Sequence, residues 1–250
     1  MSTNDKCPEL VESNAVLRRM YEERAAAEAK GIVSPTPEPR DLSLLFNLVE
    51  TKKLTSTLEI GMAHGASTVA ICEAHRQNGD GRHTAIDPYQ SRDYSGQGVR
   101  NIAESGLTDF LELHEGFSND VLPKLLKDGR KYDFVFIDGN HVFDFVFVDF
   151  FFSDLLLNDG GYILFHDANL PAVRKVISYV LRNRAYQISL ECSEETVRLG
   201  IGFRKLLYNI MATPWEPMLW GTWGSTPNYR CCLLRKLGKL EIAWDEYHSF

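Results

Sequence analysis

The stretch TLEIGMAHGAST, residues 57–68, places a carboxylate before two glycines. Gly61 permits a tight turn, and Gly65 lets a helix start close to a strand or lets a ligand approach the backbone. The spacing differs from the G-x-G-x-x-G of dinucleotide sites, and no G-K-[ST] follows as in a P-loop. A carboxylate at Glu59 would repel a pyrophosphate, but it suits a cationic amino group. These residues therefore indicate a ligand that carries an amino group and no phosphate.

A second carboxylate, Asp87, ends the next strand-like run. At that position a carboxylate can accept hydrogen bonds from both hydroxyls of a ribose. A nucleoside with a cationic amino-acid tail and no phosphate satisfies Glu59 and Asp87 together. We therefore predict S-adenosylmethionine as the ligand.

Polar side chains also lie at the carboxyl ends of the later strand-like runs. In a parallel sheet, ligands bind beyond the carboxyl ends of the strands. Any one polar strand end is more often structural than functional, but five in succession favour a site. The residues at these ends are Glu59, Asp87, Glu115 to Ser118, Asp138 to His141, and His166 with Asp167.

Strands and helices alternate through residues 41–190, which predicts βαβ units and a parallel sheet covered by helices on both faces. The runs YDFVFID and GYILF are almost wholly apolar, as expected of strands buried on both faces. Helical segments of suitable length separate the strands, for example STVAICEAHRQ and SNDVLPKLLKDG. The predicted strands are STLEIG, HTAID, LELHEG, YDFVFIDG, GYILFHD and YQISLE.

The two ends of the chain depart from this alternation. Residues 1–40 contain a helical pattern, PELVESNAVLRRMYEERAAAEAK, followed by the proline-rich GIVSPTPEPR, and we interpret them as a helical cap. We assign residues 41–250 to the main domain. An insertion at about 191–227 holds Trp215, Trp220 and Trp223, which we expect to form a lid over a pocket or a subunit contact.

Composition excludes several classes of function. The chain has 250 residues and a net charge of −7, which argues against a nucleic-acid-binding surface. No apolar run approaches the length of a membrane span, and MSTNDKCPEL has no signal-peptide core. Five cysteines without metal-site spacing are consistent with free thiols. We therefore expect a cytoplasmic protein.

The motifs together resemble those of class I S-adenosylmethionine-dependent methyltransferases. LEIGMAHGAST is similar to the first motif of the catechol and caffeoyl-CoA O-methyltransferase group, and AIDPY, EGFS and IDGNH follow in order. YDFVFIDGNHVFDFVFVDF with GGYILFHDA resembles bacterial small-molecule O-methyltransferases. The resemblance implies a Rossmann-like α/β fold with a seven-stranded, mostly parallel sheet. Its last, antiparallel strand would be RCCLLRKL.

The resemblance also places the cofactor. Glu59, Gly61 and Gly65 would surround the methionine part, and Ser67 would lie near its carboxylate at a helix N-terminus. Asp87 would bind the ribose. Ala63 stands where many relatives have glycine. The full set of predicted cofactor-binding residues is Glu59, Gly61, Ala63, Gly65, Ser67, Asp87, Pro88, Phe117, Ser118 and Asp138, with the adenine against Phe117 and Ser118.

Methylation of a hydroxyl requires a base or a cation that helps to remove its proton. In catechol-type enzymes a divalent cation is held by an Asp at the fourth strand and an Asp-Asn pair at the fifth. Asp138 and Asp167 match, but Ala168 stands at the Asn position and Asn169 comes one residue later. We predict Mg²⁺ held by Asp138 and Asp167, with His166 as a further candidate ligand.

The predicted general base is His141, since histidine ordinarily exchanges protons near neutral pH. Asp138 would orient it or stabilise its charged form, and His166 is a third catalytic candidate. The alternative for His141 is a structural role at the start of the next helix.

The predicted function is O-methylation of a phenolic or sugar hydroxyl on a small molecule, by a protein that forms a homodimer and binds neither nucleic acid nor membrane. Two alternatives stay open. One is an oxidoreductase with a nucleotide cofactor on a related fold, and the other is a non-catalytic module that binds S-adenosylmethionine.

We interpret the aromatic stretch FDFVFVDFFF, residues 143–152, as core packing.

Overall fold

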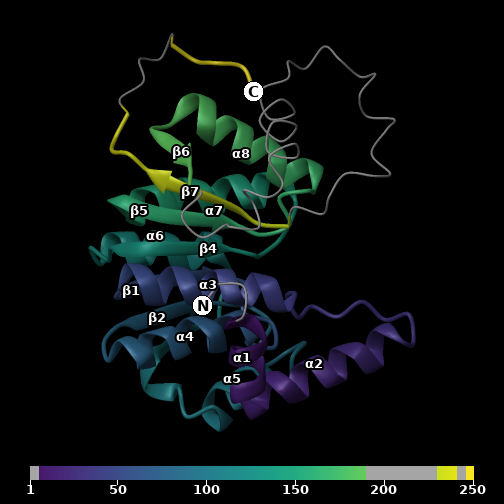
Figure 1. Cartoon of the computed structure of the whole chain (residues 1–250). Helices are drawn as coiled ribbons and strands as arrows, with labels where there is room; N and C mark the ends of the chain where they lie inside the picture. Colours follow the sequence, from purple (N-terminus) through teal and green to yellow (C-terminus); the bar gives the residue numbers. More distant parts are fainter. Residues whose placement is uncertain (1–5, 190–229, 241–245) are drawn as a thin grey trace.

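A seven-stranded sheet forms the centre of the protein in the computed structural model, which describes residues 6–189, 230–240 and 246–250 (Figure 1). The strand order is β3-β2-β1-β4-β5-β7-β6. The bounds are β1 Ser56–Ile60, β2 Arg82–Ile86, β3 Leu111–His114, β4 Tyr132–Ile137, β5 Leu157–Phe165, β6 Tyr186–Ile188 and β7 Cys232–Lys236.

Strands β1 to β5 pair in parallel, whereas β7 runs antiparallel to both β5 and β6. This arrangement confirms the predicted fold class, including RCCLLRKL as the final antiparallel strand. The chain moves outward from β1 to β2 and β3, then returns to place β4 on the other side of β1. The order therefore reverses between β1 and β4, and such a switch point is where ligands bind in open α/β sheets.

Helices cover both faces of the sheet, as the apolar strands predicted. In β4, Val135 and Ile137 pack into the core beneath α6, α7 and α8, while Phe134 and Phe136 pack into the core on the other side. That second core includes residues of α1 to α5. The helix bounds are α1 Lys6–Ser13, α2 Ala15–Glu28, α3 Pro39–Lys52, α4 Ala66–Asn78, α5 Gln97–Glu104, α6 Ser118–Lys127, α7 Phe143–Leu156 and α8 Pro171–Asn183, with a 3₁₀ turn, η2, at Thr108–Phe110.

The N-terminal helical pattern is divided into two helices, α1 and α2. The break falls at Asn14, whose side-chain oxygen accepts hydrogen bonds from the backbone N–H groups of Val16 and Leu17. An asparagine in this role starts a new helix, which the periodicity alone did not indicate. Val16, Leu17 and Met20 are buried in the same core as α3 and α4, so both helices pack onto the main domain. The domain boundary at residue 40 stays a prediction.

The aromatic stretch in α7 only partly fits our interpretation as core. Phe150 is buried against Phe165 and Tyr179. Phe145, however, is more than a third exposed and lines a cavity. Phe147, Phe150 and Phe152 pack against the core, whereas helical geometry turns Phe143, Phe145 and Phe151 toward solvent or the cavity.

Two further predictions concern membrane-spanning helices and the tryptophan-rich insertion. Within the described ranges, no helix has the length and apolar character needed to cross a membrane. The tryptophan-rich insertion, with Trp215, Trp220 and Trp223, lies outside the described residues.

Candidate active site

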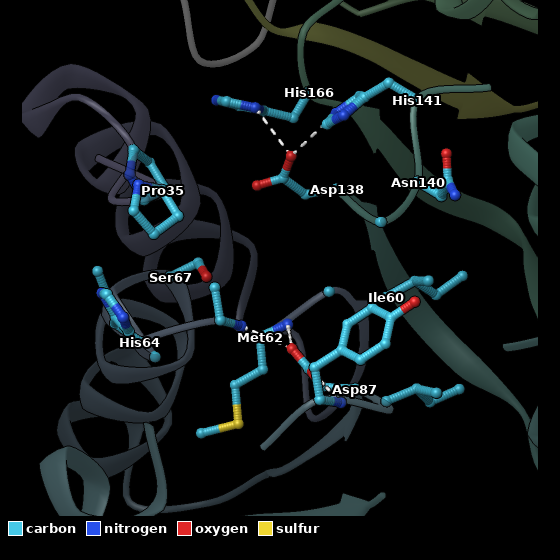
Figure 2. A pocket seen from close by; sticks show the side chains of 18 of the residues that line it. Pro35, Ile60, Met62, His64, Ser67, Asp87, Asp138, Asn140, His141 and His166 are labelled. Carbon is cyan, nitrogen blue, oxygen red and sulfur yellow. Dashed lines mark hydrogen bonds and ion pairs between the residues drawn. The ribbon is translucent and has the colours of Figure 1, made fainter. Parts of the chain in front are cut away.

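A cavity of about 460 Å³ opens at the carboxyl ends of β1, β2, β4 and β5. This volume is within the usual range for small-molecule sites. Figure 2 shows Met62, Ser67 and Asp87 in one part of it, and Asp138 between His141 and His166 in another. Of the predicted site residues, those that line the cavity are Gly61, Ala63, Gly65, Ser67, Asp87, Pro88, Phe117, Ser118, Asp138, His141, His166 and Asp167.

The turn after β1 needs its glycines for two physical reasons. Gly61 has a φ of +94°, and a Cβ there would overlap the backbone carbonyl of Asp138. Gly65 has a φ of +84° and caps the start of α4. Ala63 also takes a positive φ, +46°, although it carries a side chain. A left-handed alanine costs about 1 kcal/mol, so a glycine would adopt this conformation with less strain.

Asp87 organises this turn from the neighbouring strand. Its Oδ2 accepts hydrogen bonds from the backbone N–H groups of Met62 (3.0 Å) and Ala63 (2.7 Å), and its Oδ1 accepts one from Tyr89 (2.7 Å). A carboxylate offers roughly four acceptor positions, so about one remains for a ligand. Asp87 therefore shapes the glycine turn as well as facing the cavity.

Glu59 does not line the cavity, which corrects the predicted contact between Glu59 and the cofactor. Its side chain is fully buried, and Oε2 accepts hydrogen bonds from Thr68 (2.5 Å) and lies 3.1 Å from Nε2 of His83. His83 in turn contacts Thr57 at 2.9 Å. Because neighbouring strand residues point to opposite faces, this carboxylate turns under α4 rather than toward the ligand. Glu59 thus anchors the first turn of α4 to the sheet.

Another part of the cavity is aromatic. Phe117 is about half exposed and packs edge-to-face against Tyr89, with ring centroids 5.9 Å apart. Ser118 follows as the first residue of α6. Both residues line the cavity, and their contact with an adenine stays a prediction. Tyr89, the last residue of AIDPY, adds a second ring to this part of the cavity.

Asp149 of α7 is buried behind this part of the cavity, and one of its carboxylate oxygens has no hydrogen-bond partner among the described residues. Burial raises the pKa of Asp149 to about 6, although its side-chain interaction with Ser118 works in the opposite direction. Because the pKa of Asp149 is raised in the folded protein, its carboxyl group stabilises the folded state when it is protonated. Its contribution is therefore fully present below the unfolded pKa, near 4, and is lost as pH rises through about 6.

We accordingly expect Asp149→Asn to increase the free energy of unfolding at pH 7.5, by on the order of 3 kcal/mol. The amide has the shape of the protonated carboxyl but never ionises. Urea denaturation at pH 7.5, 5 and 4 measures the effect, and the gain should shrink as the pH falls. A gain of the same size at all three values would contradict this explanation, and Asp144→Asn near the start of the same helix is a matched control.

Four side chains converge in the remaining part of the cavity. Asp138 follows β4, His141 precedes α7, and His166 and Asp167 follow β5. Nε2 of His141 lies 3.4 Å from Asp138 and 3.5 Å from Asp167, and Nδ1 of His166 lies 3.0 Å from Asp138 and 3.5 Å from Asp167. Each of the four residues has one possible metal-ligand atom, a carboxylate oxygen or a ring nitrogen, and these four atoms lie within 4.8 Å of one another. The structure therefore brings together all four residues that the strand ends predicted.

His166 is held from both sides of its ring. Its Nε2 contacts Oδ2 of Asp41 at 3.3 Å, and its Nδ1 faces Asp138. Burial on its own lowers the pKa of His166, but the carboxylates of Asp138, Asp167 and Asp41 outweigh it and raise the pKa to about 11. Without a cation, His166 is therefore positively charged at neutral pH. A histidine in this charged state does not accept a proton, so the predicted general base is His141, and the catalytic role of His166 stays a prediction.

Asp167 completes the cluster in a strained backbone conformation, with a φ of +46°. Its Oδ1 accepts a hydrogen bond from Nε of Arg230 at 3.2 Å. Burial raises its pKa, but His166, Arg230 and His141 reverse the effect and lower the pKa to about 2. Asp167 is thus a stable carboxylate that faces the cavity.

Sequence reasoning missed several lining residues. The segment 33–37 borders the cavity, and α2 holds it in place through Tyr21, whose hydroxyl donates to the carbonyl of Pro37, and Arg24, which donates to Thr36 and Pro37. The sequence indicates a helical cap in this region, but no motif marks these residues as part of a site. Tyr94, Arg230 and Phe145 also line the cavity without a sequence signal.

Residues 58–168 match a protein family described as "Methyltransferase domain". The chain is 31% identical to a catechol O-methyltransferase of Niastella koreensis over 109 residues, 43% of this chain and 46% of that protein. The matched region thus spans just under half the length of that curated relative.

Two solved structures of O-methyltransferases have a fold similar to that of this chain. The O-methyltransferase TomG of Streptomyces achromogenes, involved in tomaymycin synthesis and solved with S-adenosylmethionine, has a TM-score of 0.58 and 20% identity, over 68% of this chain and 80% of TomG. An O-methyltransferase of Bacillus cereus, solved with S-adenosylhomocysteine, also gives 0.58 and 20%, over 70% and 83%. Residues 58–168 are therefore similar to a methyltransferase domain, and the chain shares the fold of these two O-methyltransferase structures.

Proposed function

We propose that the protein is an S-adenosylmethionine-dependent O-methyltransferase that acts on a phenolic or sugar hydroxyl of a small molecule. The observation that carries this proposal is a single cavity that joins the glycine turn and Asp87 to a cluster of carboxylates and histidines. The similarity to a catechol O-methyltransferase supports the hydroxyl as acceptor.

The lining residues fit S-adenosylmethionine, which supplies a methyl group on a sulfonium, open to displacement by an acceptor oxygen. Ser67 lies in the first turn of α4, where backbone N–H groups favour a carboxylate. Asp87 keeps about one acceptor position for a ribose hydroxyl. The rings of Phe117 and Tyr89 provide apolar surface for an adenine.

His141 is the residue in place to take the proton of the acceptor hydroxyl. Its side chain is about a third exposed, and its Nε2 has no hydrogen-bond partner among the described residues. The carboxylates of Asp138 and Asp167 stabilise the charged imidazolium that forms. Phe145, Pro35 and Pro37 add apolar surface to the cavity in which the acceptor would lie.

The same cluster fits a divalent cation, held by Asp138, Asp167 and Nδ1 of His166. Two buried ring nitrogens, Nδ1 of His166 and Nε2 of His141, face the two carboxylates without a properly directed hydrogen bond. A cation in this place would lower the pKa of an acceptor hydroxyl and fix its position.

Calorimetric titration with S-adenosylhomocysteine and with NAD⁺ tests the cofactor, and a panel of phenols and sugars assayed with S-adenosylmethionine tests the reaction. We expect binding of S-adenosylhomocysteine, no binding of NAD⁺, and methyl transfer to a hydroxyl. Preferential binding of NAD⁺ would favour the oxidoreductase alternative instead. Tight cofactor binding with no turnover on any acceptor would favour the non-catalytic module.

A further inference from the structure

Asp41 lies outside the motifs, yet it contacts the centre of the site. It belongs to the first turn of α3 and is buried, and its Oδ2 lies 3.3 Å from Nε2 of His166. Asp41 and His166 are 125 residues apart in the chain. The pair therefore connects a helix on one face of the sheet to the residue that follows β5.

Other contacts also hold the carboxylate of Asp41, among them an ion pair of its Oδ1 with Nε of Arg40 at 3.9 Å. The backbone N–H of Glu38 donates to Oδ2 at 3.1 Å, as part of the capping box of α3. The thiol of Cys231 donates to Oδ1 at 3.6 Å. These contacts hold the carboxylate in one orientation, with Oδ2 facing His166.

This orientation decides which ring nitrogen of His166 faces the cavity. A carboxylate at Nε2 keeps the proton there, so Nδ1 is the nitrogen available as a ligand atom. Nδ1 is buried, lies 3.0 Å from Asp138 and 3.5 Å from Asp167, and makes no properly directed hydrogen bond among the described residues. Histidines that bind metals commonly donate their other ring N–H to a carboxylate in this way.

We propose that Asp41 is a positioning residue that turns Nδ1 of His166 into a metal ligand, and that the site consequently prefers a transition-metal dication such as Mn²⁺, Co²⁺ or Zn²⁺ to Mg²⁺. Carboxylate oxygens alone suit Mg²⁺, whereas an imidazole nitrogen favours later first-row metals. Ala168 stands where the catechol-type pattern has its asparagine, so that oxygen ligand is missing here, while the cluster offers the nitrogen of His166. The inference rests on the proposed function of this cluster and changes the expected metal.

Metal binding to the full chain tests the inference without measuring methyl transfer. The metal-stripped protein is titrated with Co²⁺ and Mg²⁺ by calorimetry, and the visible absorption of bound Co²⁺ reports nitrogen ligation. We expect one Co²⁺ site at least 100-fold tighter than Mg²⁺. In Asp41→Asn we expect Co²⁺ affinity to fall about 10–100-fold, with a changed Co²⁺ spectrum and little change for Mg²⁺.

A purely structural role for Asp41 would lower thermal stability without changing the Co²⁺ spectrum or the ratio of the two affinities. His166→Gln serves as a second variant, because it removes the nitrogen and leaves the cap of α3 intact. Mg²⁺ binding as tight as Co²⁺, or unchanged Co²⁺ binding in both variants, would overturn the inference. Either result, combined with normal binding of S-adenosylhomocysteine and normal turnover, would leave the proposed function standing.

Discussion

His141→Ala is expected to lower kcat for methyl transfer by about 10²–10⁴-fold, the usual contribution of a general base. The affinity for S-adenosylhomocysteine should stay nearly unchanged, because His141 lies with Asp138 and Asp167 rather than at the glycine turn. The loss should appear in kcat because removal of the acceptor proton belongs to the transition state. Steady-state kinetics with the best acceptor of the hydroxyl panel, together with calorimetry, measures both quantities.

The same variant separates two roles for His141. If it is the base, Co²⁺ should bind to His141→Ala almost as tightly as to the unaltered protein. If its Nε2 is a ligand, Co²⁺ affinity and turnover should fall together. His248→Ala is a matched control, because His248 is exposed and does not line the cavity. Full turnover in His141→Ala would eliminate the base assignment.

The fold was largely predictable because its signals are local. Each buried strand is a short apolar run, and the strand ends place Asp87, Asp138 and His166 on one edge of a parallel sheet by geometry alone. The same reasoning brought His141 and Asp167 to the cluster. The number of strands and the antiparallel last strand followed from the resemblance, whereas the strand order is known only from the structure.

The errors have a different physical origin. Glu59 was misplaced because a motif names a residue but not the direction of its side chain, which alternates along a strand. Asp41 and Arg230 were missed because their partners, His166 and Asp167, are 125 and 63 residues away. Contacts of that range depend on how α3 and β7 pack onto the sheet, and one sequence holds no local signal for them.

The structure also changes what is expected of Asp87. From the sequence it is a ribose-binding residue, whose loss would weaken cofactor binding alone. In the structure its carboxylate accepts three backbone hydrogen bonds, from Met62, Ala63 and Tyr89. Removing it leaves buried N–H groups without partners in a turn whose backbone conformation is already strained at Ala63.

Asp87→Ala should therefore lower both stability and cofactor affinity. We expect the free energy of unfolding to fall by about 2–4 kcal/mol, and the dissociation constant of S-adenosylhomocysteine to rise at least tenfold, which is about 1.4 kcal/mol. Urea denaturation measures the first effect, and calorimetry at a temperature where the variant is fully folded measures the second. Asp93→Ala is the control, since this carboxylate is exposed and pairs with Arg92.

The two measurements distinguish the roles of Asp87. A stability loss with unchanged affinity would mean that the turn is restored when the cofactor binds, and that the ribose does not use this carboxylate. Weaker binding with unchanged stability would mean that the three backbone hydrogen bonds contribute little. Only a loss in both agrees with a carboxylate that shapes the turn and still offers one acceptor position to the ligand, because the same group then serves the folded backbone and the bound ribose.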